Sequence, residues 1–335
     1  MKIGLRSALG IGGGAGNFLL QLAQEIKRAQ CAEIVGSYNP FQDIGLYSSV
    51  HRGLPWIPYI LRLDGVYFDK EETEGSNQAL NRPIYKSINK ASGIIFQSEF
   101  CKELFESHYG PITKPNIVIL NGANLQQKQI NAQKKAGVRQ GEIRRIICAA
   151  KWRKHKRLRS IIEAVRQLNK TGEYELIVLG EVGAAEENDS FITYVGEVPH
   201  ASISQYLEKA NLFLHLCWLD SCPNAVVEAI THGLPVVCSN QGGTPEIVRA
   251  TNAGFISECD APVDYSGLVD LYNPPSPDIN KVVSSVKNVF EQYDSILNKM
   301  DFTQVDIALT TQKYLSFCQQ VIDSLHNKTY SNDKL

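Results

Sequence analysis

The chain has 335 residues, of which 43% are hydrophobic and 21% are charged, a composition typical of a globular protein with room for two cores. Its 34 Lys and Arg residues nearly balance its 35 Asp and Glu residues, and the net charge of -1 excludes a general electrostatic attraction to nucleic acid or anionic lipid. No apolar run in the sequence approaches the about 18 residues that a membrane span needs.

Short apolar runs alternate with amphipathic stretches, which predicts an α/β fold with parallel strands. In the first half we expect a strand at 2–8, a glycine-rich turn at 10–16 and a helix at about 17–29, then strands at 33–38, 57–63, 93–97 and 117–120 and helices at about 77–91 and 99–108. In the second half we expect strands at 146–150, 175–179, 191–195, 211–216 and 235–238, helices at about 157–169, 200–209 and 223–232, and a long helix at about 303–326.

The stretch 125–143 is polar and lacks aromatic residues, so we interpret it as a linker between two Rossmann-like halves. This interpretation predicts an N-terminal domain over 1–142 (with the linker from about 125), a C-terminal domain over 143–302 and a final helical segment over 303–335. Open parallel sheets bind ligands beyond the carboxyl ends of their strands, so motifs at those positions are the candidates for a site.

The eight cysteines are scattered singly and form no CxxC pair, which disfavours a zinc site and fits free thiols in a reducing compartment. The N-terminus enters a strand-like run directly and has no signal-peptide pattern. We therefore expect a cytoplasmic protein, with a peripheral position at a membrane face as an alternative.

The glycine-rich turn at 10–16 lies between the first strand and the first helix, where backbone N–H groups can approach a phosphate. Gly10, Gly12 and Ala15 also fit the dinucleotide pattern G-x-G-x-x-A, but the second strand ends at Asn39 and lacks the acid that this pattern requires. Phosphate contact is the favoured interpretation, and a plain tight turn or an NAD site are the alternatives.

Six of the nine residues at 151–159 are Lys or Arg, directly after an expected strand. That position favours an anion site, in which two cations could hold a diphosphate and neutralise it as it leaves. A solvated charged face is the plainer alternative, and the net charge disfavours a nucleic-acid patch.

Two acids flank the start of a predicted helix, Asp220 in the preceding loop and Glu228 inside the helix. Pro223 suits the first turn of that helix and Gly233 suits its end. Carboxylates so placed can accept hydrogen bonds from sugar hydroxyls, although a capping Asp and a surface Glu would give the same pattern individually. A buried strand follows and leads into the paired glycines Gly242 and Gly243.

Together these motifs resemble the retaining glycosyltransferases of family 4. That family carries E-x7-E, E-A-x-x-x-G-x-P-V-V and G-G-x-x-E-I-V, and the corresponding residues here are 220–228, 228–237 and 242–248. Its G-R-x4-K-G resembles Ala150-Lys151-x4-Lys156-Arg157, its F-x-G-x-V resembles 194–198, and its N-G-V-D resembles 121–124. The resemblance implies the GT-B fold, with two Rossmann-like domains facing across a cleft and a C-terminal helix that crosses back to the N-terminal domain.

The resemblance also implies roles for individual residues. Glu228 would hold the ribose hydroxyls of a nucleotide diphosphate sugar, Asp220 would contact the transferred sugar, and Lys151 and Lys156 would hold the diphosphate. The remaining donor-binding residues implied are Gly12, Gly13, Gly14, Gly16, Asn224, Ala225, Val198, Gly180 and Gly243. The family works without a bound metal or cofactor, and its reaction proceeds with retention of configuration. The implied acceptor is a glycan, a lipid-linked molecule or another hydroxyl compound, and no nucleic-acid partner is expected.

Three positions depart from the family pattern. Asp220 replaces the usual Glu, Lys151 replaces Arg, and Asp64 follows an apolar strand where many members have His. We expect Asp64 to contact the acceptor or the sugar, with turn formation by Asp64-Gly65 as the alternative. If the changes at Asp220 and Lys151 abolish turnover, the chain would be a nucleotide-sugar-binding scaffold subunit; another GT-B enzyme acting on nucleotide sugars, such as an epimerase, is the further alternative.

Overall fold

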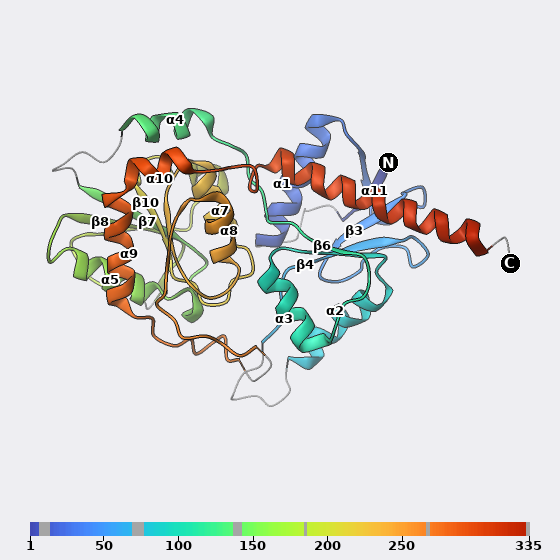
Figure 1. Ribbon diagram of the computed structural model, residues 1–335, viewed down its shortest axis with the longest axis horizontal. Coiled ribbons are helices and arrows are strands. Elements are labelled where there is room, and N and C mark those ends of the chain that lie inside the picture. Colours follow the sequence, from blue (N-terminus) through green and yellow to red (C-terminus); the bar gives the residue numbers. More distant parts are fainter. Residues whose placement is uncertain (7–13, 69–76, 137–142, 184–185, 266–268, 333–335) are drawn as a thin grey trace. The chain divides into compact units, whose positions relative to one another are not determined.

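The computed structural model describes residues 1–6, 14–68, 77–136, 143–183, 186–265 and 269–332, which form two compact units (Figure 1). The first unit comprises Met1–Ala123, Tyr265–Val269 and Ile307–Leu335, and the second comprises Asn124–Asp264 and Asp270–Asp306. The chain first passes between the units at Ala123, before the boundary at 142 that the composition suggested.

The first unit is built on a six-stranded sheet in which every paired strand is parallel to its neighbour. The order is β2 (Glu33–Gly36), β1 (Lys2–Leu5), β3 (Ile44–Ser48), β4 (Tyr59–Leu63), β5 (Gly93–Phe96) and β6 (Asn116–Val118). Three helices connect these strands: α1 (Gly14–Ala29), α2 (Gln78–Lys90) and α3 (Glu99–Tyr109). The sequence did not predict β3, because this strand is almost fully buried and therefore shows no alternation of polar and apolar residues.

The last helix, α11 (Ile307–Asn332), belongs to the first unit, as the fold prediction required. Its residues Ile307, Tyr314, Phe317, Cys318 and Val321 share one apolar core with β1, β3 and α1. Figure 1 shows α11 running beside α1 and across the first sheet. A Cβ on Gly93 would lie only 2.8 Å from Val321 Cγ2, so a glycine at this position allows β5 to approach the helix.

The second unit has a parallel sheet of the same size. Its order is β12 (Gly254–Ser257), β11 (Val236–Ser239), β10 (Leu212–His215), β7 (Arg144–Ala149), β8 (Tyr174–Leu179) and β9 (Ile192–Gly196). Its helices are α5 (Leu158–Leu168), α6 (Ser204–Leu207), α7 (Asn224–Thr231), α8 (Thr244–Thr251), α9 (Ile279–Glu291) and α10 (Tyr293–Lys299), and short 3-10 turns lie at Lys154–Lys156 and His200–Ser202. β12, α9 and α10 were not predicted.

The segment interpreted as a linker contains a helix, α4 (Gln127–Ala136), that packs on the second unit. Ile130 is 2% exposed, Gln133 donates to the carbonyl of Ala210 at 3.0 Å, and Tyr293 donates to Gln133 at 3.3 Å. The sequence did not predict this helix, because few of its residues face inward and its composition is therefore mostly polar. Among the described residues, no helix combines the length and apolar character that a bilayer span requires.

The contact of α11 with the first unit can be tested by shortening Phe317, which is 5% exposed. We expect Phe317→Ala to lower the free energy of unfolding of the first unit by about 3–5 kcal/mol, because it removes a buried ring and leaves a cavity. Hydrogen exchange of amides in β1 and β5 measures this loss, with exposed Gln320→Ala as the matched control on the same helix. Equal protection in the two variants would contradict this packing.

Candidate functional site

Polar residues gather where parallel strands of the second sheet end. The loop after β7 carries Lys156, the loop after β10 carries Asp220, and the loop after β11 carries Gly242 and Gly243. Because β10 pairs with both β7 and β11, these loops leave the same edge of the sheet. The sheet therefore brings together residues that lie far apart in the sequence.

The contact at the centre of this edge is an ion pair between Lys156 Nζ and Asp220 Oδ2. Each side chain is 20% exposed, so both charges are largely removed from water. Burial raises the pKa of the Asp220 carboxyl, but the charge and hydrogen bond of Lys156, together with His215 and His155, outweigh burial and lower this pKa to about 2. Burial lowers the pKa of Lys156, but Asp220 and Cys217 together raise this pKa above its usual value. The pair is therefore ionised across the neutral range.

A second, more deeply buried ion pair fixes the loop that carries Lys156. Arg157 makes two hydrogen bonds to Asp260, at 2.8 and 2.9 Å, and the two side chains are 2% and 1% exposed. The Arg157 guanidinium also lies 5.9 Å from the centre of the Trp218 ring. The Trp218 amide in turn donates to the carbonyl of His155 at 2.8 Å. These contacts join the loops after β7, β10 and β12.

The paired glycines hold the loop that carries Asp220. The amide of Gly243 donates to the Asp220 carbonyl at 2.7 Å. Gly242 has a φ of +83°, and a Cβ there would lie 2.9 Å from the Asp220 nitrogen, so the position requires glycine. The Gly243 amide is thus bonded within the protein, and its expected contact with a donor stays a prediction.

Glu228 lies in α7, with its side chain 12% exposed, and one of its carboxylate oxygens is 2.7 Å from His200 Nε2. Asn224 and Ala225 form the first turn of the same helix and are half-buried. A helix N-terminus favours an anion, so this turn has the electrostatic character expected of a phosphate contact.

Other predicted residues lie around this edge. Lys151 is exposed, and no carboxylate among the described residues lies within ion-pair distance of it. Gly180 has a φ of +100°, and a Cβ there would lie 2.0 Å from the Ala150 carbonyl, so packing alone accounts for this glycine. Val198 is half-buried just after β9. The structure thus gives a structural reason for Gly180 and leaves Lys151 as an accessible cation.

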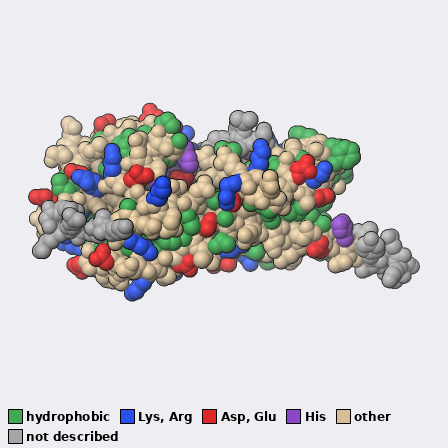
Figure 2. Space-filling model, turned by 90° about the horizontal axis from the view of Figure 1, so that it is seen from above, with side chains coloured by type: hydrophobic (Ala, Val, Ile, Leu, Met, Phe, Trp, Pro, Cys, Tyr) green, Lys and Arg blue, Asp and Glu red, His purple; other side chains and the backbone are tan. Residues whose placement is uncertain are grey.

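The basic run 151–159 is not one solvated face. His155 is buried, Lys156 and Arg157 are bound to carboxylates, and Lys151, Arg153, Lys154 and Arg159 are exposed. On the surface that Figure 2 shows, the described Lys and Arg side chains are interspersed with Asp and Glu side chains.

Several buried groups beside the ion pair were missed by the motif analysis. His215, Cys217 and Asp220 bring their potential ligand atoms within 4.8 Å of one another, a set that could hold a metal ion. Lys156 already binds the carboxylate, and burial raises the pKa of the Cys217 thiol to about 12, so this environment disfavours a cation. Within the described part of the chain, His155 Nδ1, His215 Nε2 and Trp218 Nε1 are buried without a hydrogen-bond partner. Long-range packing creates this cluster, and no local signal identifies it.

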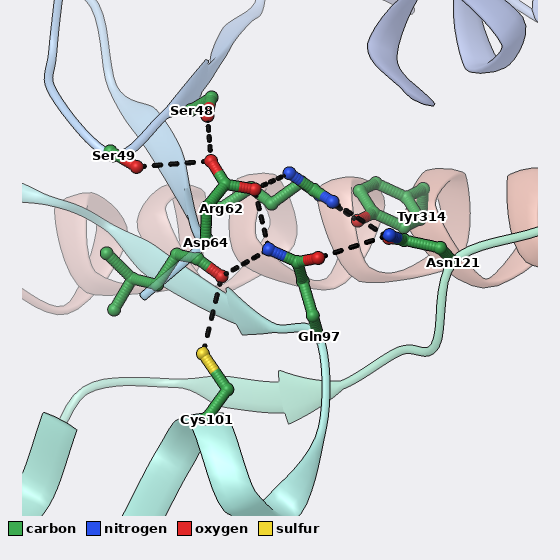
Figure 3. Close-up of polar contacts among 9 residues, drawn as sticks. Ser48, Ser49, Arg62, Asp64, Gln97, Cys101, Asn121 and Tyr314 are labelled. Atoms are coloured by element: carbon green, nitrogen blue, oxygen red, sulfur yellow. Dashed lines mark hydrogen bonds and ion pairs between the residues drawn. The ribbon is translucent and has the colours of Figure 1, made fainter. Parts of the chain in front are cut away.

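The first unit has its own polar network, at the end of β4 (Figure 3). Arg62 is fully buried, pairs with Asp64 and donates to Asn121 at 2.8 Å and to Tyr314 of α11 at 3.1 Å. Asp64 also accepts from Gln97 at 2.6 Å and from Ser48 and Ser49.

Asp64 therefore has a structural partner that sequence reasoning did not foresee. Its side chain is 23% exposed, while both carboxylate oxygens already accept hydrogen bonds from protein groups. Its expected contact with an acceptor or sugar stays a prediction. In the glycine-rich turn, Gly12 and Gly13 lie outside the described residues, Gly14 begins α1 and Gly16 is buried in it.

The buried histidines predict a pH dependence of stability. Burial lowers the pKa of His215 from 6.5 to about 4, so between these values the unfolded chain binds more protons than the folded chain. The free energy of unfolding of the second unit should therefore fall as the pH is lowered through this window, by about 3 kcal/mol at most from His215. Urea unfolding at several pH values should show a shallower dependence for His215→Gln. Exposed His326→Gln is the control, and the same slope in wild type and His215→Gln would contradict the account.

Two comparisons with known sequences found relatives. Residues 129–272 match the model of a protein family described as Glycosyl transferases group 1. The amylovoran biosynthesis glycosyltransferase AmsK of Erwinia amylovora is 30% identical over 129 residues, which cover 34% of this chain and 32% of that protein. The match thus spans about a third of the length of this curated relative.

Solved structures share the fold over nearly the whole chain. The apo form of the lipopolysaccharide outer core galactosyltransferase WaaB has a TM-score of 0.64 at 12% identity, covering 96% of this chain and 99% of that chain. Anabaena HepE in complex with UDP-glucose has a TM-score of 0.60 at 16% identity, covering 98% of this chain and 100% of that chain. The chain therefore has the GT-B fold of these proteins, and the part that matches the glycosyltransferase family contains the Lys156–Asp220 pair.

Proposed function

We propose that the chain is a glycosyltransferase that moves a sugar from a nucleotide diphosphate sugar to a hydroxyl of an acceptor. The observation that carries this proposal is the Lys156–Asp220 pair, with Glu228 on the neighbouring helix α7. All three residues lie within the region that matches the family Glycosyl transferases group 1. The alternative activity of an epimerase has no specific observation in its favour.

Lys151 and Lys156 would bind the diphosphate of the donor. An ammonium group has three N–H donors, and because Lys156 contacts both Asp220 and Cys217, one donor is left for a phosphate oxygen. Lys151 is exposed and would add a second positive charge. The two lysines would neutralise the leaving diphosphate, a task that a divalent metal performs in other enzymes. The proposal therefore includes a reaction that needs no metal ion.

Asp220 and Glu228 would recognise hydroxyl groups, Asp220 those of the transferred sugar and Glu228 those of the ribose. Both carboxylates are mostly buried, at 20% and 12% exposed, so hydrogen bonds to them are shielded from water. The first turn of α7, with Asn224 and Ala225, would lie against the phosphates or the sugar. Gly12, Gly13, Gly14, Gly16, Gly180, Val198 and Gly243 complete the proposed donor contacts.

The proposed reaction retains the configuration of the transferred sugar, as in family 4. The acceptor hydroxyl attacks on the face that the diphosphate leaves, and the leaving phosphate oxygen takes the proton of the acceptor. No protein base is required for this step. The N-terminal unit would bind the acceptor, a glycan or a lipid-linked molecule. A cytoplasmic location, with a position at a membrane face as the alternative, is part of the same proposal.

The second candidate is a nucleotide-sugar-binding subunit without turnover. The observation that favours it is the ion pair itself, because a short Asp220 side chain holds Lys156 close and could limit the reach of both groups. Binding would then persist while transfer is absent. The two candidates share the donor site and differ only in chemistry, so binding and turnover need separate measurements.

Donor binding can be measured by calorimetry with UDP, GDP and dTDP, with and without EDTA. We expect one diphosphate to bind regardless of EDTA, and Lys151→Ala to weaken its binding by about tenfold, because a charge-assisted hydrogen bond is lost. Lys154→Ala is the matched control, since Lys154 is exposed in the same loop. Absence of binding to all three diphosphates, or equal losses in the two variants, would overturn the donor site.

Turnover and its stereochemistry can be measured together by NMR, with methanol as a surrogate acceptor and the sugar nucleotide of the base that binds. An α-linked donor should give the methyl α-glycoside, which cannot change its anomeric form after release. Asp220→Asn should lower the rate, since its amide would be a poorer acceptor for sugar hydroxyls. A β-glycoside would contradict retention, and binding without any product would favour the non-catalytic subunit.

A further inference from the structure

The turn His200–Ser202 and the start of α6 are tied to α7 by two histidines, of which His200 lies outside the motifs described above and His232 occupies an unspecified position in one of them. His200 Nε2, in the turn His200–Ser202, lies 2.7 Å from Glu228 Oε1. His232, at the end of α7, lies 2.8 Å from Ser204 Oγ through Nε2 and 2.7 Å from the Glu228 carbonyl through Nδ1. Both contacts converge on Glu228, one on its side chain and one on its backbone.

The contact of His200 restricts the Glu228 carboxylate. A glutamate side chain has several rotatable bonds, and fixing it in one rotamer costs conformational entropy when a ligand binds. Because the hydrogen bond from His200 to Oε1 already restricts the Glu228 rotamer in the ligand-free protein, less conformational entropy is lost when a ligand binds. Among the described residues, His200 is the one that makes a hydrogen bond or ion pair with this carboxylate, through Oε1. The other oxygen, Oε2, is then the acceptor for a ligand hydroxyl.

The His200 side chain is 53% exposed, so its protonation follows the solvent pH. The hydrogen bond to Glu228 raises the pKa of His200 above its usual value, burial opposes this shift, and the charge of Glu228 adds to it. The other titratable groups at this turn are His232 and Glu208, which both contact Ser204 rather than His200. The contact is therefore charge-assisted at low pH and becomes a weaker neutral hydrogen bond as the pH rises through the His200 pKa.

We propose that His200 is a positioning residue, which holds Glu228 so that its second oxygen selects donors with a ribose 2′-hydroxyl over 2′-deoxy donors. This inference rests on the proposed function, because Glu228 is placed there on the ribose. It goes further in assigning the selection between ribo- and deoxynucleotides to a histidine outside the motifs. It also makes this selection dependent on pH.

The test compares the dissociation constants of UDP and 2′-deoxy-UDP, with the guanosine pair used if GDP is the diphosphate that binds. The two nucleotides carry the same diphosphate, so their ratio cancels phosphate titration and the contribution of the lysines. We expect wild type to prefer UDP by about tenfold, and His200→Leu to reduce this preference by about fivefold, as loss of one oriented hydrogen bond implies. Since His200 is exposed, the substitution should leave the fold intact.

His200→Gln is the matched variant, because its amide N–H can reach Glu228 as Nε2 does but does not titrate. We expect it to keep most of the preference for UDP. The preference of wild type should fall as the pH rises through the His200 pKa, which lies above its usual value, whereas that of His200→Gln should stay constant. An unchanged preference in His200→Leu, or equal pH dependence in wild type and His200→Gln, would overturn the role of His200 while leaving the donor site intact. Binding of dTDP alone would overturn this inference and leave the donor site intact, because dTDP has no 2′-hydroxyl, whereas failure of wild type to bind UDP, GDP and dTDP would remove both.

Discussion

The buried pair of Arg157 and Asp260 is the contact on which the geometry of the candidate site depends. It joins the loop after β7 to the loop after β12, and both side chains are at most 2% exposed. Arg157 directly follows Lys156 and has a left-handed backbone, with φ of 53°. Removing one partner of such a pair leaves an uncompensated buried charge, which costs about 3–5 kcal/mol. Lys156 is therefore held in place before any ligand arrives.

This arrangement makes the site ready for an anion without leaving a buried charge alone. Lys156 is neutralised by Asp220 and retains an N–H donor beyond its contacts with Asp220 and Cys217, while Lys151 stays in solvent. A diphosphate would meet positioned donors rather than flexible side chains, so little ordering entropy would oppose binding. The first unit also places an ion pair after a strand, but there Arg62 is fully buried and Asp64 accepts from several neighbours. That network links β4 to α11 through the hydrogen bond from Arg62 to Tyr314, so it stabilises the packing of α11 on the first unit.

The sequence predicted most of the fold because long apolar runs and turn residues carry strong local signals. It failed at β3, which is buried and shows no alternation of polar and apolar residues, at β12, α9 and α10, and at α4, whose polar face outweighs a few buried residues such as Ile130. The sequence placed Lys156 and Asp220 after the ends of predicted strands, and their roles came from the family resemblance; the ion pair between them was not predicted. Contacts such as Arg157–Asp260 and His200–Glu228 join residues from separate loops, and no local pattern marks them. The partners of Asp64 were missed for the same reason.

The most direct test of the account is a crystal structure of the chain with the nucleoside diphosphate that it binds. The account predicts the diphosphate beside Lys151 and Lys156, with the ribose hydroxyls on the Glu228 oxygen that His200 does not contact. Lys156 should keep its contact with Asp220 while it donates to a phosphate oxygen. A diphosphate bound elsewhere on the second unit, with the Lys156–Asp220 pair and Glu228 untouched, would contradict the central claim.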